Sequence, residues 1–377
     1  MSASTTADER LTIPRESEAA SAVPVGKRAL QAVYYALVLW IPIETIATIK
    51  NDDGSTVAFS RILGLILFGL ALVNRRICFR RIPAVFWLIA WYLVVFSATQ
   101  LWIPAGLDKA FRENQMTLIQ MAVLFLISAN LMSEEKFRGG LLRFYGWWVT
   151  SVAAAMMLGA FGAPSVEMAG RGSILGQDPN VAAVYFALGA VCLAGDPRML
   201  APRRFGARVV AALLAISVLI MAILQTGSRG GLLVFLTGFA GLAVCGTPAT
   251  RKMRGLVAGA VLVVLGGLVL WQFQQVTPTA LRLNAAWTQG DTAGRTRIYA
   301  AAWSMFEKKP LLGYGGANNT FLLGADLAYA SGRDYYRDTH NLLLAVLTEV
   351  GLIGAVPFVA ALVCALWIAG RYGRRTV

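Results

Sequence analysis

Long apolar segments without charged residues constrain this chain more than any other feature. Three of them are 211–224, 231–246 and 255–273, which contain no Asp, Glu, Lys or Arg. A membrane hydrocarbon core of about 30 Å needs about 20 apolar residues per helix, and about 17 are sometimes enough. Charged residues make up only 14% of the 377 residues, against about 25% in soluble domains. The sequence therefore predicts a polytopic membrane protein.

We expect an all-α protein with about ten transmembrane helices. The predicted helices are 28–46, 57–73, 84–102, 116–131, 143–163, 180–194, 207–224, 230–246, 255–273 and 341–369. The corresponding units are a disordered cytoplasmic tail at 1–27, a nine-helix membrane bundle at 28–273, a long periplasmic loop with short helices at 274–340, and the last transmembrane helix with a cytoplasmic end at 341–377.

The distribution of basic residues predicts the orientation. A net charge of +14 in a soluble protein would suggest nucleic-acid binding. Here most Lys and Arg lie in the tails and in the loops on one side of the predicted membrane. The short loops on the other side hold only Lys50, Lys109, Arg112, Arg171 and Arg229. The positive-inside rule then places both termini in the cytoplasm, and no nucleic-acid partner is expected.

The long loop at 274–339 is predicted to be folded, because it contains several aromatic and aliphatic residues. Within it, Arg295–Lys308 has apolar residues close to helical spacing. These are Ile298, Ala302, Met305 and Phe306. Pro310 ends that helix, and the glycines of 313–316 make a turn. We expect a small helical cap over the outer mouth of the bundle.

The segment Gln225–Gly231 (Gln-Thr-Gly-Ser-Arg-Gly-Gly) is a candidate phosphate-binding turn. Arg229 is predicted at the N-terminus of a helix, where free backbone N–H groups and the helix dipole favour an anion. A guanidinium matches phosphate oxygens better than a lysine does, and Ser228 and Gly230 flank it. The alternative is an interfacial arginine that extends to lipid headgroups.

Two further outward segments complete the candidate site. Arg295 and Arg297 begin the predicted loop helix, where a cation is unfavourable unless an anion is shared. In Asp338-Thr339-His340-Asn341, Asp338 is predicted to be the N-cap and to place His340, the only histidine, in the first turn of the last helix. The dipole would there favour a neutral imidazole that can act as a general base. The alternative is a histidine that caps or packs at the interface.

Other outward polar residues carry weaker signals. Asp52-Asp53-Gly54 favours an ordinary turn, and Asp178 is expected to begin a helix. Glu44 and Arg61 lie near the outer ends of two helices, where charges pair with each other or face a cavity. Arg171 would extend a basic cleft.

Four segments, in this order along the chain, resemble the O-antigen ligase and polymerase family of bacterial envelopes. Thr226–Gly231 matches its Thr-Gly-Ser-Arg-Gly-Gly, and Gly294–Trp303 matches its Gly-Arg segment followed by an aromatic residue. Pro310–Gly315 matches Pro-Leu-Leu-Gly-Tyr-Gly, and His340–Gly354 runs from His-Asn-Leu-Leu-Leu to Glu-Val-Gly-Leu-Ile-Gly. Family members often have two helices after the one that begins at this histidine, whereas the predicted helix 341–369 is the last one here.

The resemblance implies a GT-C-like glycosyltransferase in the bacterial inner membrane that uses neither a metal ion nor a cofactor. Its donor would be a glycan on undecaprenyl diphosphate at the periplasmic face. The acceptor would be lipid A core for a ligase, or a growing lipid-linked glycan for a polymerase. By resemblance, His340 would activate the acceptor hydroxyl. The diphosphate would be bound by Arg229, Arg295, Arg297 and Arg171, with support from Ser228, Gly230, Asn341 and Asp338.

The residues alone are also compatible with two other classes of function. A transporter or flippase for a lipid-linked glycan would need ionisable groups or broken helices near the membrane midplane. A structural protein of envelope assembly would not need His340.

Overall fold

The computed structural model describes residues 25–50, 56–160, 177–196, 205–244, 295–329 and 336–375, with five single helical residues between 255 and 267. The predicted tail at 1–27 lies almost entirely outside the described residues. So do Asp52, Asp53, Arg171 and most of the predicted helix 255–273.

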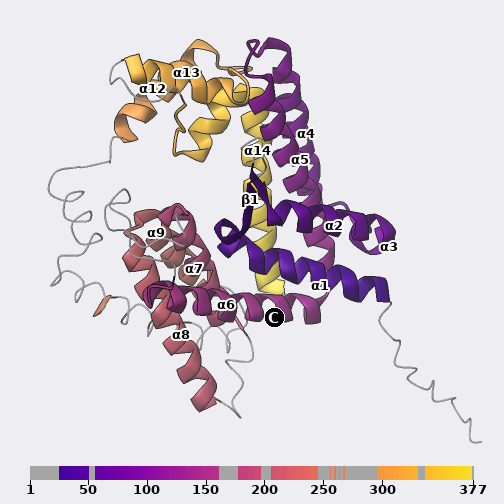
Figure 1. Ribbon diagram of the computed structural model, residues 1–377, viewed down its shortest axis with the longest axis vertical. Helices are drawn as coiled ribbons and strands as arrows, with labels where there is room; N and C mark the ends of the chain where they lie inside the picture. Colours follow the sequence, from indigo (N-terminus) through magenta and orange to yellow (C-terminus); the bar gives the residue numbers. More distant parts are fainter. Residues whose placement is uncertain are drawn as a thin grey trace, which may run out of the picture.

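The N-terminal part of the chain is a series of helices with one short β ribbon (Figure 1). Its elements are α1 (Val25–Trp40), the 3-10 helix η1 (Ile41–Ala47), β1 (Thr48–Lys50), β2 (Thr56–Ala58), α2 (Phe59–Val73), α3 (Arg75–Cys78), α4 (Ala84–Ala98), the 3-10 helix η2 (Thr99–Trp102), α5 (Asp108–Leu131) and α6 (Glu135–Met157). The two strands pair antiparallel, with Thr48 opposite Ala58. Apart from this ribbon, the all-helical prediction is confirmed for the described residues.

The C-terminal part adds six described helices. They are α7 (Pro179–Ala194), α8 (Phe205–Thr226), α9 (Arg229–Val244), α12 (Arg295–Lys308), α13 (Asn318–Tyr329) and α14 (Leu342–Arg375). Four described helical segments are long and apolar enough to cross a membrane. These are Ala84–Trp102, Asp108–Leu131, Gly206–Thr226 and Leu342–Arg371. The chain is therefore an integral membrane protein, whereas the full set of ten spans stays a prediction.

Two clusters of buried side chains hold the membrane helices of the N-terminal part and the central bundle. One joins α1, α2, α3 and the ends of α5 and α6. The other joins α6, α7, α8 and α9 around Phe186, Phe235 and Phe239. The α7 side of this bundle presents small residues, including Ala183 and Ala187. Small residues let apolar helices approach closely, where dispersion contacts replace the hydrophobic driving force that water would supply.

Two further clusters build the predicted cap and its support. Phe96 of α4 and Phe111 of α5 stack with a centroid separation of 5.1 Å, and this pair packs against α14. In the cap, α12 and α13 bury Ile298, Ala302 and Met305 between them and the start of α14. The predicted apolar face of Arg295–Lys308 is thus confirmed, and Figure 1 shows α12 and α13 beside the upper arm of α14.

A break at Gly351 divides α14 into two arms. Gly351 has φ 59° and ψ −165°, which lie outside the helical region. A Cβ at this position would lie 2.3 Å from the carbonyl carbon and oxygen of Leu311, so only glycine fits. The break interrupts the i→i−4 hydrogen bonds of the helix, and the groups that it frees need other partners.

The Pro310–Gly315 turn supplies those partners. The N–H groups of Tyr314 and Gly315 donate to the carbonyls of Thr348 and Glu349, each at 2.8 Å. In the other direction, the N–H groups of Leu352 and Ile353 donate to the carbonyls of Pro310 and Leu311 at 2.8 and 3.2 Å. We call this set of four backbone hydrogen bonds the clasp. It fixes the cap to the membrane part of α14.

Candidate active site

The Arg229 turn connects α8 to α9 through a short segment of defined geometry. Gly227 has a positive φ of 62°, which reverses the chain. Ser228 is buried and caps α9, because its Oγ accepts the N–H of Gly231 at 3.0 Å. The hydroxyl of Thr226 accepts the N–H of Ser228 at 3.2 Å. Arg229 is the first residue of α9 and is partly exposed, so the predicted helix start is confirmed.

The two glycines after Arg229 differ in their surroundings. A Cβ on Gly231 would lie 2.4 Å from the Cβ of Ala183 in α7, so this glycine lets α9 pack against α7. A Cβ on Gly230 would have no neighbour closer than the Oγ of Ser228 at 3.9 Å. Gly230 is exposed, and it leaves space beside the N-terminal turn of α9. A bulky anionic group could therefore approach the backbone there.

Two further arginines lie at the beginning of the cap. α12 starts at Arg295, as predicted, with Arg295 partly exposed and Arg297 fully exposed. The opposite face of α12 buries Ile298 and Ala302 against α13 and α14. The arginine-bearing end of α12 is therefore fixed by packing, while its guanidinium groups remain accessible.

The prediction that Asp338 caps the last helix and that His340 lies in its first turn is wrong. α14 begins at Leu342, and its cap is Asn341, whose Oδ1 accepts the N–H groups of Leu343 at 3.0 Å and Leu344 at 3.3 Å. His340 lies before the cap in a left-handed conformation, with φ 52°. His340 therefore lies outside the first turn of the helix, where the dipole would have acted on its imidazole.

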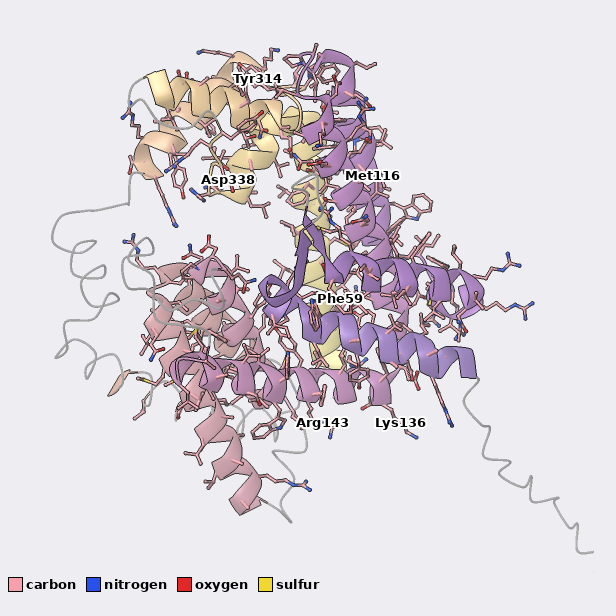
Figure 2. The ribbon with its side chains drawn as sticks, in the orientation of Figure 1. Phe59, Met116, Lys136, Arg143, Tyr314 and Asp338 are labelled. Atoms are coloured by element: carbon pink, nitrogen blue, oxygen red, sulfur yellow. The ribbon has the colours of Figure 1, made fainter. Side chains whose placement is uncertain are left out.

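Hydrogen bonds, rather than a helix, fix the segment around His340, in which Figure 2 labels Asp338. Asp338 Oδ1 accepts the backbone N–H of His340 at 3.3 Å. Thr339 is buried, and its hydroxyl donates to the carbonyl of Asn341 at 3.0 Å. Arg337 donates its N–H to the carbonyl of Thr320 in α13 at 3.0 Å. The imidazole of His340 is exposed, so a fixed backbone presents an accessible side chain.

The candidate residues belong to two units of the protein. Arg229 lies in the bundle of α6 to α9, whereas Arg295, Arg297 and His340 lie in the cap and at the start of α14. Figure 1 shows the α7–α9 bundle below the cap of α12 and α13. Among the described residues, no three side chains of His, Cys, Asp or Glu gather as they would around a metal ion.

Part of the chain is similar to a known protein family. A family model described as O-antigen ligase matches residues 210–359. This part of the chain is similar to O-antigen ligases. Neither the curated proteins nor the solved structures that were compared with the chain include a match.

The matched segment begins within α8 and ends within α14, so it contains Arg229, Arg295, Arg297 and His340. It also contains both halves of the clasp. The match supports an enzyme of the ligase and polymerase type in surface polysaccharide biosynthesis, which acts on lipid-linked glycans at a membrane. Arg171 lies outside the matched residues and outside the described structure.

A further polar cluster, which the sequence alone did not indicate, joins the matched segment to α4. Glu349 accepts a hydrogen bond from the hydroxyl of Tyr92 in α4 at 3.1 Å. Asn319 is buried at the start of α13, and its Nδ2 donates to the hydroxyl of Thr348 at 3.3 Å. The available signal was Glu349 itself, the only acidic residue of α14, because ionisable residues within membrane helices are rarely without a role.

Outside the matched segment, the structure also places the weaker candidates Glu44, Arg61 and Asp178. The hydroxyl of Ser60 donates to the carboxylate of Glu44, while Arg61 is exposed and lines a cavity. The expected pairing of Glu44 with Arg61 is therefore wrong, and the alternative that Arg61 faces a cavity is confirmed. Asp178 caps α7 by accepting the N–H of Asn180 at 2.7 Å, as predicted.

Proposed function

We propose that this protein transfers a glycan from undecaprenyl diphosphate to an acceptor at the periplasmic face of the bacterial inner membrane. The observation that carries the proposal is the O-antigen ligase match over residues 210–359, which includes two arginines at helix N-termini and the exposed His340. Most Lys and Arg lie in the tails and in the loops on one side of the predicted membrane, which supports an orientation with both termini in the cytoplasm.

The proposed reaction is a direct displacement at the anomeric carbon of the donor sugar. An acceptor hydroxyl forms the new glycosidic bond while the bond from the anomeric carbon to the diphosphate oxygen breaks. The hydroxyl proton passes to a ring nitrogen of His340, and the bonding electrons leave with the diphosphate. The configuration at the anomeric carbon is inverted, and the proposal includes neither a metal ion nor a cofactor.

Arg229 and Arg295 have the complementary role of holding the leaving group, with Arg297 and Arg171 as further cations. Charge on the diphosphate increases as the glycan departs, and prepositioned donors stabilise that charge without reorganisation. The α9 N-terminus adds the N–H groups of its first turn to the guanidinium of Arg229. Ser228 and Gly230 support this end of the site, and Asp338 and Asn341 fix the backbone on either side of His340.

A lipid-linked glycan transporter is the alternative that one observation favours. The broken helix at Gly351 with the nearby Glu349 has the form of a transporter binding site. In a transporter, however, the freed backbone groups at such a break face the substrate. Here the clasp occupies four of them, which favours a structural role for the break and leaves the enzyme as the better proposal.

Complementation of a strain that lacks the gene tests the proposal. We expect His340→Ala to abolish long glycan chains on the cell surface at unchanged protein level. Arg229→Lys and Arg295→Lys should each lower transfer at least about tenfold, because a lysine cannot reproduce a bidentate contact. Lys308→Gln, an exposed cation at the other end of α12, is the matched control and should complement fully.

The glycan profile of the same strain separates the two kinds of transferase. Loss of all long chains from lipid A, with accumulation of lipid-linked polymer, identifies a ligase. Single repeat units on the acceptor identify a polymerase. Normal surface glycan with His340→Ala would exclude a catalytic role for this histidine.

A further inference from the structure

A second group of cations lies outside the candidate active site, between α2 and α5. A cavity of about 530 Å³ is lined there by the basic side chains of Arg61, Lys109 and Arg112 and by one carboxylate, Glu113. Met116, Thr117 and Gln120 complete the lining. We call this cavity the α2–α5 groove. In Figure 2, Met116 marks its α5 side and Phe59 marks the beginning of α2.

Among the described residues, no carboxylate forms a salt bridge with the cations of the α2–α5 groove. The salt bridges within the described part of the chain join Lys27 to Glu134 and Arg143 to Asp196, so none of the three cations takes part in one. The Nε of Arg112 donates to the carbonyl of Asp108 in its own helix, at 3.4 Å. One carboxylate therefore faces three cations, and the α2–α5 groove carries a net positive charge.

The position of Lys109 adds to this imbalance. It lies in the first turn of α5, where the positive end of the helix dipole disfavours a cation. Arg61 is in the first turn of α2 and experiences the same effect. A shared anion would relieve both the mutual repulsion and the unfavourable dipole, and a phosphate can accept hydrogen bonds from two guanidinium groups at once.

The α2–α5 groove changes from charged to apolar along α5. Lys109, Glu113, Met116 and Thr117 follow one another at spacings that share a helix face. Met116 is 54% exposed and lies about two turns into a helix long enough to cross a membrane. A soluble phosphate would use only the charged end. A lipid with a phosphorylated headgroup would use both, with its phosphate at the cations and its chain beside Met116.

We propose that the α2–α5 groove binds the phosphate group of an anionic membrane lipid through Arg61, Lys109 and Arg112. This site is separate from the residues that the proposed function assigns to the donor diphosphate. It uses helices outside the O-antigen ligase match. Its test reads lipid binding rather than glycan transfer, so the two proposals fail independently.

Native mass spectrometry of the purified full-length protein in detergent tests this site. Added phosphatidic acid should be retained more than phosphatidylcholine of the same chain length. Each of Arg61→Gln, Lys109→Gln and Arg112→Gln should lower phosphatidic acid affinity about fivefold. The charge-preserving variant Lys109→Arg should retain it. Lys136→Gln combined with Lys308→Gln removes two exposed cations elsewhere and should bind like the wild type.

Three outcomes would overturn the assignment. One is equal retention of the two lipids by the wild type. Another is unchanged phosphatidic acid affinity in the triple glutamine variant. The third is displacement of phosphatidic acid by millimolar inorganic phosphate, which would identify a site for a soluble anion rather than for a lipid.

Discussion

The bundle of α6 to α9 and the unit made by the cap with α14 each position part of the candidate active site, and they do so by different means. In the bundle, Arg229 is placed by residues close to it in the chain, mainly the Ser228 cap and the close packing at Gly231. In the cap, Arg295 and His340 depend on the clasp, which joins residues far apart in sequence. The local contacts around Arg229 should tolerate single changes, whereas the clasp requires a glycine at position 351.

The largest effect is therefore expected at the clasp, from Gly351→Ala. The new Cβ would lie 2.3 Å from backbone atoms of Leu311, and alanine disfavours the positive φ of 59°. Backbone strain and overpacking together should cost about 3 kcal/mol or more. A thermal unfolding scan in detergent measures this loss, and limited proteolysis should show earlier cleavage of the cap.

Gly370→Ala is the matched control for the clasp. Gly370 lies in the same helix, and a Cβ there meets nothing within 4 Å. Its unfolding temperature should equal that of the wild type or exceed it slightly. Equal unfolding temperatures for Gly351→Ala and Gly370→Ala would mean that the clasp does not hold the cap.

A smaller effect is expected in the bundle, from Gly231→Ala. The added Cβ would meet the Cβ of Ala183 at 2.4 Å, but α9 can move away from α7 as a unit. Overpacking of this kind typically costs about 2 kcal/mol. Gly241→Ala, also in α9 and with open space around it, should be neutral in the same thermal scan. If Gly231→Ala destabilised more than Gly351→Ala, the contrast between the two units would be reversed.

The same contrast explains what the sequence could predict. The bounds of α12 were predictable, since the apolar spacing of Arg295–Lys308 and the following Pro310 are local signals. The start of α9 at Arg229 was equally local. The break at Gly351 was not, because a single glycine is compatible with an apolar helix. Pro357 is the more obvious breaker, and yet it lies inside α14. What decides the break is the Pro310–Gly315 turn, which no local pattern connects to α14.

The sequence alone also misplaces the start of α14, for a related reason. Asp338 and Asn341 are both good N-cap residues, and the sequence does not choose between them. In the structure, the buried Thr339 and the left-handed His340 keep the chain out of the helix until Asn341. Burial of Thr339 depends on packing against other elements, so the position of His340 could be located only in three dimensions.

Removal of a helix cap should have a similar, moderate effect in both units. Ser228→Ala in the bundle and Asn341→Ala at α14 each remove a side-chain acceptor from the first helical turn. Each should cost about 1 kcal/mol, whereas glycine at either position should cost only a few tenths. Chemical unfolding of the four variants measures the difference. A much larger loss for Asn341→Ala than for Ser228→Ala would show that Asn341 also supports the clasp.

The smallest effect compares two tyrosine hydroxyls. Tyr92→Phe removes the hydrogen bond from α4 to Glu349 at 3.1 Å, and the loss of one such bond should cost about 0.5–1.5 kcal/mol. Tyr145→Phe removes a contact to the carbonyl of Tyr185 at 3.5 Å, which is at the limit of a hydrogen bond. Its unfolding free energy should be close to that of the wild type. Equal losses in the two variants would mean that the α4–Glu349 contact adds nothing specific to the support of the cap, and the clasp alone would then fix it.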